Sequence, residues 1–495
     1  MKNSVRRLVI AGIGVLIQII WVVVLVMRLN QYSQIITLLT VAIELVLVLA
    51  VYSMDTNAAF KLPWIILITV APIVGICVFF LFGRSGATKK VRTRYRKIDQ
   101  QLFAYLNQDE QIIDELSKKD ERLANDFKYL WKCASSPVYK NTDVKYYGDT
   151  CDAMAAQLED MMQAKQFIFL EYHAIEMAES FQALRKVLMA KAREGVEIRI
   201  LYDDAGCIGF LNPRFIKYME SMGIQCRVFN PIMPVLNIFM NNRDHRKITV
   251  IDGKVAYTGG YNLADEYFNI THPYGQWKDS GIRFEGDAVQ TATILFLEMW
   301  NALKEQDVDI EKYLPVYPYK AKEQGFFALY GDSPLDKEPA GENVYMNLLR
   351  HAKKYIYFTT PYLILSDEMT RELTGAAKRG VDVRIITPGI PDKKTIFQVT
   401  KSYYPQLLKH GVKIYEYTPG FMHEKQCICD GEIVVVGTIN LDFRSLYLHF
   451  ENAALFCGYE AVSHVKEDFD ALFPICKDMS KEPSERTRRL RLSQL

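Results

Sequence analysis

Two segments of the sequence repeat the same set of reactive residues. HRKITVIDGKVAYTGGYNL (245–263) and HEKQCICDGEIVVVGTINL (423–441) align at a constant offset of 178 residues. A lone histidine two residues before a lysine is more often structural than functional, but its recurrence with matched downstream residues indicates a shared function. The matched positions are His245/His423, Lys247/Lys425, Asp252/Asp430, Gly253/Gly431, Gly259/Gly437, Asn262/Asn440 and Leu263/Leu441.

Each repeat combines groups that suit an anionic phosphate ester. Residues two apart on a strand point to the same face, so a histidine and a lysine at this spacing can address one ligand. The later glycine and asparagine supply flexible backbone and an amide for phosphate oxygens. Asp-Gly between two apolar runs predicts a two-residue hairpin turn. Asp252 and Asp430 are therefore expected to set turns rather than to act directly on a substrate.

Two such repeats facing each other would form one phosphodiester site. One histidine would attack phosphorus and the other would protonate the leaving oxygen. Neither a metal nor a cofactor is expected, because the nonbridging oxygens would be neutralised or hydrogen-bonded by Lys247, Lys425, Asn262 and Asn440. No comparable context surrounds the other six histidines, which are His173, His272, His351, His410, His449 and His464.

The elements that must position these residues alternate between strand and helix. The pattern predicts a strand over 167–172, a helix over 181–193 and a strand over 196–202, which together indicate α/β layers. REGVEIRI (193–200) is similar to KRGVDVRI (378–385), and FIFLEY (167–172) to YIYFTT (355–360). We therefore expect two similar α/β halves, with mixed sheets flanked by helices, that share one active site. Their expected bounds are 136–320 and 321–480.

Three apolar segments precede these halves, at 8–27, 35–52 and 63–82. Each is close to the roughly 20 residues that a helix needs to cross a bilayer. Glu44 makes the second segment the weakest, because a carboxylate at mid-bilayer is costly. The first could be a signal peptide, but 20 apolar residues exceed the usual apolar region of about 7 to 15. Residues 1–82 are thus expected to be a membrane anchor with two to three transmembrane helices.

Basic residues suggest which side of the membrane the halves occupy. Four lie on the side of the N-terminus and eight on the other, seven of them between Arg84 and Lys97. Because positive residues are retained inside, residues 83–495 are expected in the cytoplasm. The nine cysteines, an odd number without staple-like spacing, suit reduced thiols. Residues 83–135 are interpreted as a basic juxtamembrane and helical linker, and 481–495 as a basic tail.

The overall charge limits the partners. With 60 Lys and Arg against 58 Asp and Glu, the net charge of +2 does not suit a protein that coats nucleic acid. The basic run at 84–97 would instead attract anionic lipid headgroups, at about 1 kcal/mol for each cation near the surface. The membrane is therefore the expected partner, and the sequence leaves the oligomeric state open.

The paired motifs resemble those of the phospholipase D superfamily, whose HxKxxxxD pattern occurs twice here. The closer resemblance is to the bacterial cardiolipin synthase family, through NNRDHRKITVIDGKVAYTGGYNLADEY (241–267), WKDSGIRFEG (277–286) and YEYTPGFMHEKQCICDGEIVVVGTINLDFRSLYLHFEN (415–452). The resemblance implies that the acids beyond each motif, Asp279 and Glu451, hold the imidazoles in the productive tautomer. It also implies that the catalytic set is His245, Lys247, Asp252, His423, Lys425 and Asp430.

The resemblance further implies a reaction between two phosphatidylglycerol molecules at the cell membrane. His245 would form a phosphatidyl-histidine while His423 protonates the departing glycerol, and the second lipid would then capture the phosphatidyl group as cardiolipin. A hydrolase and a CDP-diacylglycerol-dependent phosphatidyltransferase would require the same histidines and remain open. A nuclease suits the apolar front end poorly, and a noncatalytic lipid-binding protein would not require two complete motifs.

Overall fold

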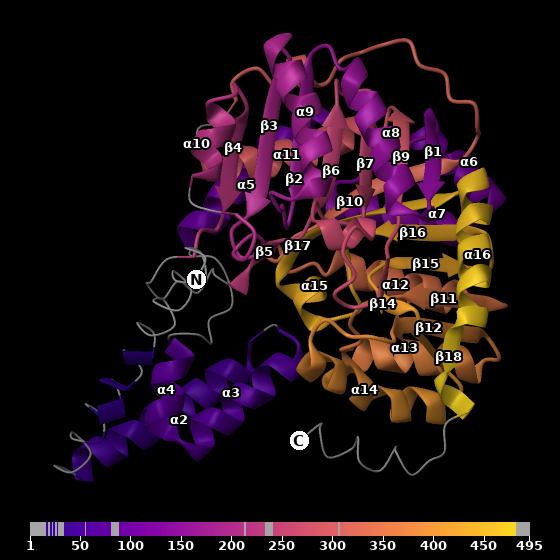
Figure 1. Cartoon of the computed structure of the whole chain (residues 1–495). Coiled ribbons are helices and arrows are strands. Elements are labelled where there is room, and N and C mark those ends of the chain that lie inside the picture. Colours follow the sequence, from indigo (N-terminus) through magenta and orange to yellow (C-terminus); the bar gives the residue numbers. More distant parts are fainter. Residues whose placement is uncertain are drawn as a thin grey trace. The chain divides into compact units, whose positions relative to one another are not determined.

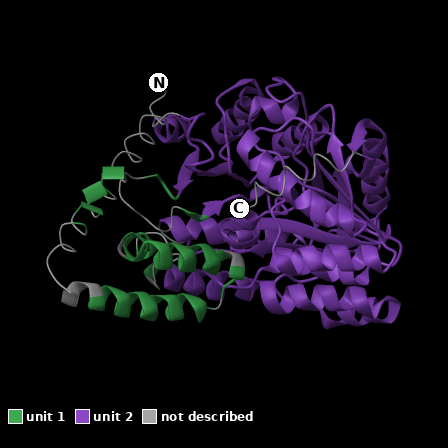
Figure 2. Cartoon of the chain, turned by 90° about the horizontal axis from the view of Figure 1, so that it is seen from below, with its two compact units in different colours: residues 1–90, 230–242 green, residues 91–229, 243–495 purple. Residues whose placement is uncertain are grey.

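A computed structural model describes residues 34–54, 56–80, 89–211, 214–232, 241–304 and 307–481, with a few positions between 16 and 27 (Figure 1). The chain divides into two compact units, which Figure 2 shows in different colours. The first consists of residues 1–90 and 230–242, and the second of 91–229 and 243–495. Both repeated motifs belong to the second unit.

Among the described residues of the first unit, three helices have defined bounds, which are α2 (Gln34–Tyr52), α3 (Ala58–Val70) and α4 (Pro72–Val78). The apolar segment 63–82 is thus not one continuous helix. Pro72 begins α4 because proline has no amide hydrogen to donate to the preceding turn. The buried side chains of Val51, Ile68 and Phe79 pack together as a small core.

Many apolar side chains of α2 are exposed, among them Leu38 at 71% and Leu49 at 66%. In the part of the chain that the structure describes, no helix is both long enough and apolar enough to span a bilayer. Most of the segment 8–27 lies outside the described residues. The membrane-spanning helices therefore stay a prediction.

The second unit contains two large sheets built on the same plan. The first has the strand order β1-β9-β7-β6-β2-β3-β4. Strands β2, β3 and β4 are parallel, and the other pairs are antiparallel. Its strands are β1 (Thr142–Tyr147), β2 (Phe167–Tyr172), β3 (Glu197–Asp203), β4 (Gln225–Phe229), β6 (Lys247–Ile251), β7 (Val255–Gly259) and β9 (Gly281–Gly286).

The second sheet repeats this order strand for strand as β10-β17-β16-β15-β11-β12-β13, with β18 added at one edge and β5 paired to β17. Figure 1 shows its strands β10 to β18 in orange to yellow, and those of the first sheet in purple to pink. The predicted internal repeat is therefore visible in the fold. The strands are β5 (Arg243–Asp244), β10 (Phe326–Asp332), β11 (Tyr355–Thr359), β12 (Asp382–Pro388), β13 (Lys413–Tyr417), β15 (Gln426–Cys429), β16 (Ile433–Gly437), β17 (His449–Cys457) and β18 (Cys476–Asp478).

The local predictions hold at most boundaries. The strand at 167–172 is confirmed as β2, the strand at 196–202 is β3, and the helix at 181–193 begins two residues earlier, at Glu179. The remaining helices are α5 (Lys89–Leu102), α6 (Glu110–Lys119), α7 (Glu121–Ala134), α8 (Thr150–Gln163), α9 (Glu179–Arg193), α10 (Phe215–Glu220), α11 (Val289–Leu303), α12 (Ala340–His351), α13 (Asp367–Lys378), α14 (Lys394–Lys409), α15 (Phe443–Tyr447) and α16 (Glu460–Leu472).

The two sheets meet within this unit. Helix α11, buried along almost its whole length, contacts strands of the first sheet and β10 of the second. Two short ribbons also cross between the halves, because β5 pairs with β17 and β8 (Gln276–Lys278) pairs with β14 (Gly420–Met422). Each ribbon leads directly into one of the repeated motifs.

The Asp-Gly turns have the expected backbone. Asp252 and Gly253 have φ values of 53° and 64°, and the Lys254 amide donates to the Ile251 carbonyl at 3.0 Å. However, Ile251 pairs with Val255, so the connection contains three residues instead of two. The second repeat has the same geometry at Asp430.

Candidate active site

The two crossing ribbons place each repeated histidine against a strand of the other half. The backbone amide of His245, which follows β5, donates to the carbonyl of Phe450 in β17 at 2.8 Å. The amide of His423, which follows β14, donates to the carbonyl of Lys278 in β8 at the same distance. In both cases the residue that follows the carbonyl acceptor is one of the predicted orienting acids, Glu451 after Phe450 and Asp279 after Lys278.

Each imidazole therefore pairs with the carboxylate of the other half. His245 Nδ1 lies 2.8 Å from Glu451 Oε2, and His423 Nδ1 lies 2.6 Å from Asp279 Oδ2. Asp279 follows His245 by 34 residues and Glu451 follows His423 by 28, yet each acid contacts the histidine of the other repeat. A carboxylate on Nδ1 fixes the tautomer and leaves Nε2 directed at a ligand. A single site thus requires both halves.

Residues at matched positions of the two repeats, Thr438 and Gly260, lie against these carboxylates. Thr438 donates its hydroxyl to Glu451. Gly260 occupies the corresponding position in the first repeat, where a side chain would place Cβ 2.1 Å from Asp279 Oδ1. The first repeat therefore needs glycine here because the carboxylate approaches the backbone too closely for any Cβ.

The two lysines lie within the same cluster. Lys247 Nζ donates to the carbonyl of His245 at 2.6 Å, and Lys425 Nζ is 2.7 Å from His423 Nδ1 and also donates to the carbonyl of His423. Burial lowers the pKa of Lys247 to about 8 and that of Lys425 to about 7. Both ammonium groups are therefore held where an anion would stabilise their charge.

Both imidazoles favour the neutral form in the free protein. Burial, followed by the charge of Lys247, holds the pKa of His245 well below its usual range. Burial and Lys425 lower the pKa of His423 to about 4, although Asp279 opposes this shift. Lys425 also depresses the pKa of His245, and Lys247 that of His423, which shows that the two motifs act on each other electrostatically.

The aspartates of the two motifs lie elsewhere. Asp252 accepts hydrogen bonds from the amides of Lys165, Gln166 and Phe167 at 2.7 to 2.9 Å, at the end of β6 opposite the imidazole. Asp430 makes the matching contacts before β11. Neither carboxylate is placed beside a histidine, so the structure gives both the turn-setting position expected from Asp-Gly rather than a catalytic one.

The two asparagines are partly committed to protein contacts. Asn262 accepts from the Ala174 amide at 3.1 Å and donates to the Tyr267 hydroxyl at 2.8 Å. Asn440 bonds through its side chain to Asp442, while its Oδ1 is buried and accepts no hydrogen bond among the described residues. Binding of phosphate by these amides stays a prediction.

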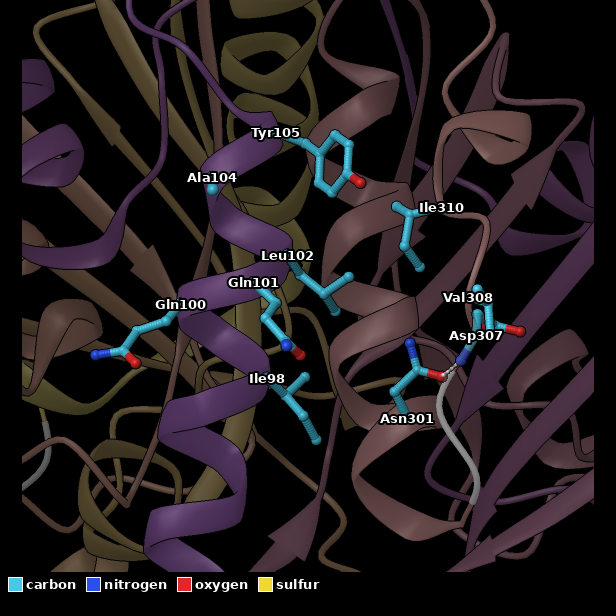
Figure 3. Close-up of a pocket in the computed structure, with 10 residues that line it drawn as sticks. All are labelled: Ile98, Gln100, Gln101, Leu102, Ala104, Tyr105, Asn301, Asp307, Val308 and Ile310. Atoms are coloured by element: carbon cyan, nitrogen blue, oxygen red, sulfur yellow. Dashed lines mark hydrogen bonds between the residues drawn. The ribbon is translucent and has the colours of Figure 1, made fainter.

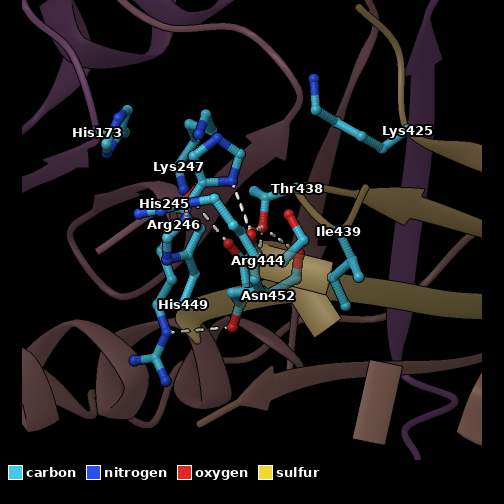
Figure 4. Close-up of polar contacts among 12 residues, drawn as sticks. His173, His245, Arg246, Lys247, Lys425, Thr438, Ile439, Arg444, His449 and Asn452 are labelled. Carbon is cyan, nitrogen blue, oxygen red and sulfur yellow. Dashed lines mark hydrogen bonds and ion pairs between the residues drawn. The ribbon is translucent and has the colours of Figure 1, made fainter. Parts of the chain in front are cut away.

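The surroundings of the two imidazoles differ, and the sequence did not reveal this. The rings of His173 and His449 lie 5.0 and 5.9 Å from the ring of His245. Figure 4 shows both histidines together with Arg444, whose Nε lies 3.4 Å from His449 Nε2. The ring of His423 instead contacts Tyr267 and Trp277 at 5.2 and 5.1 Å. The histidines lacked a repeated counterpart, so no sequence signal distinguished them.

Ionic contacts behind the imidazoles also differ between the repeats. Arg246 is 1% exposed, pairs with Glu298 at 2.8 Å and donates to the Glu451 carbonyl. At the corresponding position Glu424 pairs with Lys278 at 2.8 Å. The residue that follows the motif histidine is thus a buried cation in the first repeat and a buried anion in the second.

A pocket of about 350 Å³ lies between α5 and the residues that follow α11 (Figure 3). It is lined by Gln101, Leu102, Asn301, Asp307 and neighbouring side chains. None of these residues belongs to the repeated motifs, so this pocket supplies no catalytic group.

The lysine pKa values predict a pH-dependent affinity for phosphodiesters. Between pH 7 and 9 both ammonium groups lose protons, and a bound anion would restore them. Binding of glycerophosphoglycerol, which keeps one negative charge over this range, should take up protons and weaken by about tenfold toward pH 9. Calorimetry in buffers of different ionisation enthalpy measures both quantities. An affinity that is constant from pH 7 to 9, without proton uptake, would contradict this account.

Comparison with known proteins identifies similar chains. A family model described as "Cardiolipin synthase, PLD-like domain" matches residues 158–300 and 345–473. An uncharacterized protein of Streptococcus mutans is 41% identical over 86% of this chain and 91% of its own length. The cardiolipin synthase of Halalkalibacterium halodurans is 32% identical over 89% and 87%, and cardiolipin synthase 2 of Bacillus anthracis is 30% identical over 86% and 81%.

One solved structure supports the architecture. The phosphatidylserine synthase of Haemophilus influenzae matches 71% of this chain and 91% of its own length with a TM-score of 0.54. At 12% identity this similarity concerns the fold alone.

Proposed function

Since the chain belongs to the cardiolipin synthase family with phospholipase D-like domains, we propose that it transfers a phosphatidyl group from one phosphatidylglycerol to another, giving cardiolipin and glycerol. One observation carries this proposal most strongly. Two imidazole–carboxylate pairs, each made from both halves, enclose one cluster with the two lysines. This arrangement suits double displacement at a phosphodiester without help from another protein chain.

The first step uses the two histidines in different roles. Glu451 holds Nδ1 of His245, so that Nε2 attacks phosphorus and the bond to the glycerol headgroup breaks. His423 gives its proton to the departing glycerol oxygen. Lys247 and Lys425 stabilise the negative charge on the nonbridging oxygens. The product of this step is a phosphatidyl group on His245.

His423 must carry a proton for this step, although its pKa in the free protein is lowered to about 4. The anionic phosphodiester supplies the missing stabilisation, because a nearby negative charge favours the imidazolium. Substrate binding and protonation are therefore coupled. In the second step neutral His423 accepts the proton of the incoming hydroxyl, and His245 leaves phosphorus.

The bilayer supplies both lipids, and we place the chain in the cell membrane. Residues 1–82 form the anchor with two to three transmembrane helices, and the exposed apolar side chains of α2 support a lipid environment. Helix α5 buries Tyr95 and Ile98 but exposes Arg96 and Lys97, which suits an anionic membrane surface. The catalytic halves, 136–320 and 321–480, face the cytoplasm. Anchoring raises the effective concentration of the acceptor lipid.

A donor-choice experiment tests the function. The purified full chain, reconstituted with phosphatidylglycerol alone, should form cardiolipin and glycerol in equal amounts by mass spectrometry. Adding CDP-diacylglycerol should not increase the yield. Phosphatidic acid as the sole product would instead identify a hydrolase, and cardiolipin that forms only with CDP-diacylglycerol would identify the other donor.

A further inference from the structure

Aromatic rings lie close to His423, and we name this group the aromatic collar. Trp277 and Phe421 lie 4.7 Å apart, ring centre to ring centre, and their rings are 5.1 and 5.8 Å from that of His423. Tyr274 and Tyr362 continue the group outward, at 6.2 and 6.4 Å from Phe421. The members of the aromatic collar are Tyr267, Tyr274, Trp277, Tyr362 and Phe421.

The aromatic collar has a buried floor and a partly exposed rim. Tyr267, Trp277 and Phe421 are 7%, 6% and 1% exposed, whereas Tyr274 and Tyr362 are half-buried. Tyr267, Tyr274 and Trp277 come from the first half, and the other two rings from the second. The two halves thus build this surface together, as they build the imidazole–carboxylate pairs. Ring faces suit the CH groups of a ligand and offer water few hydrogen bonds.

Asp392 supplies a hydrogen-bond acceptor at the rim. Its Oδ2 accepts from the Tyr362 hydroxyl at 2.6 Å. Its Oδ1 is buried, and among the described residues it accepts no hydrogen bond. Leaving such an atom unpaired destabilises the folded protein, so its presence calls for an explanation. A ligand hydroxyl would provide the missing donor.

The Asp392 segment acts electrostatically on a residue beside each imidazole. The charge of Asp392 acts on Tyr267, which contacts His423, and the charge of the neighbouring Lys393 acts on His173, which contacts His245. A second carboxyl group belongs to Glu266, whose pKa is raised to about 7 by burial and then by the charges of Glu176 and Asp392. Two carboxyl groups therefore adjoin the aromatic collar, Asp392 through its bond to Tyr362 and Glu266 as the chain neighbour of Tyr267.

We propose that the aromatic collar, with Asp392 and Glu266, is the acceptor subsite and selects the polyol headgroup of the second lipid. This inference rests on the proposed function. In the capture step one hydroxyl of the polyol gives its proton to His423, its oxygen bonds to phosphorus, and the bond from phosphorus to His245 breaks. The remaining hydroxyl donates to Asp392 or Glu266. The glycerol released in the first step leaves through the same subsite.

The subsite explains how an alcohol succeeds against water. A polyol can donate a hydrogen bond to the Asp392 carboxylate and at the same time pack its CH groups against the aromatic collar. A single water molecule can only donate the hydrogen bond. Exclusion of water from a reactive intermediate is a general requirement of transfer enzymes. A monohydric alcohol lacks the second hydroxyl, so it should capture the phosphatidyl group less efficiently than a polyol.

Phosphatidyl-p-nitrophenol is the donor that isolates this subsite, because its leaving group carries no further hydroxyl. Release of p-nitrophenolate reports the first step, and the products formed with added glycerol or ethanol report capture. The informative variants of the full chain are Asp392→Asn and Tyr362→Phe, which keep the size of each side chain. Asp114→Asn, at an exposed position of α6, and Tyr105→Phe are the matched controls.

With glycerol added, the wild type should form more phosphatidylglycerol than phosphatidic acid, and it should use glycerol in preference to ethanol. Both product ratios should fall about fivefold or more in Asp392→Asn and in Tyr362→Phe. The controls should keep the wild-type ratio, and phosphatidylglycerol vesicles should show the same change in cardiolipin against phosphatidic acid. Variants whose ratios stay within twofold of wild type would overturn the subsite while leaving the function intact. A wild type that gives phosphatidic acid alone would overturn the proposed function instead.

Discussion

Replacing either repeated histidine with alanine should reduce cardiolipin formation by at least about a hundredfold. His245→Ala removes the nucleophile and His423→Ala removes the proton donor, and each loss alone is expected to cost two or more orders of magnitude. Neither residue holds the fold together, because each imidazole contacts mainly one carboxylate and neighbouring rings. The transfer assay should be read together with circular dichroism and a thermal melt.

His272→Ala is the matched control, because His272 is exposed and lies outside both motifs. It should retain wild-type turnover. Substantial turnover in either motif variant, with the fold intact, would refute the two-histidine mechanism.

The crossed carboxylates predict a second large effect with a distinctive pattern. Glu451→Gln should impair His245, and Asp279→Asn should impair His423, because each amide can stabilise the wrong tautomer. With phosphatidylglycerol both variants should lose about 10² to 10⁴ in turnover. With phosphatidyl-p-nitrophenol the leaving group departs without a proton donor, so release of p-nitrophenolate should survive in Asp279→Asn and fail in Glu451→Gln.

The opposite pattern would show that the acids pair with the histidines of their own halves. The two histidine variants provide the references. With phosphatidyl-p-nitrophenol as donor, His423→Ala should behave like Asp279→Asn, and His245→Ala should behave like Glu451→Gln. Equal losses in all four variants with both donors would indicate a general collapse of the site instead of separate roles.

The sequence predicted the repeat and the local elements because both are recorded in neighbouring residues. The constant offset of the motifs, the alternation of strand and helix and the Asp-Gly turns all act over short distances. The structure then extends the repeat to seven strands in identical order. Strand order in the sheets depends on long-range pairing, which no single segment specifies.

The crossing of the carboxylates could not be predicted in this way. His245 and Glu451 are 206 residues apart, and His423 and Asp279 are 144 apart. Their pairing depends on the two short ribbons between the halves, and strands of two or three residues leave little pattern in a sequence. Both acids were identified only through the resemblance to a family.

Residues that occur in one half alone were also missed. His173, His449 and the aromatic collar have no matched partner in the other repeat, so a search for internal similarity passes over them. Tyr267 and Trp277 have the composition of ordinary core residues, and they do pack in the core of the first half. Only their distance from His423 indicates a role beside the reaction.

Trapping the covalent intermediate is the most direct test of the central claim, that one site built from both halves transfers the phosphatidyl group through His245. The full chain should be mixed with phosphatidyl-p-nitrophenol, quenched under alkaline conditions within milliseconds to seconds, and digested for peptide mass spectrometry. We predict a phosphatidyl group on His245 that disappears as cardiolipin forms when phosphatidylglycerol is added. An adduct on His423, or cardiolipin formation at full rate without any adduct, would contradict the account.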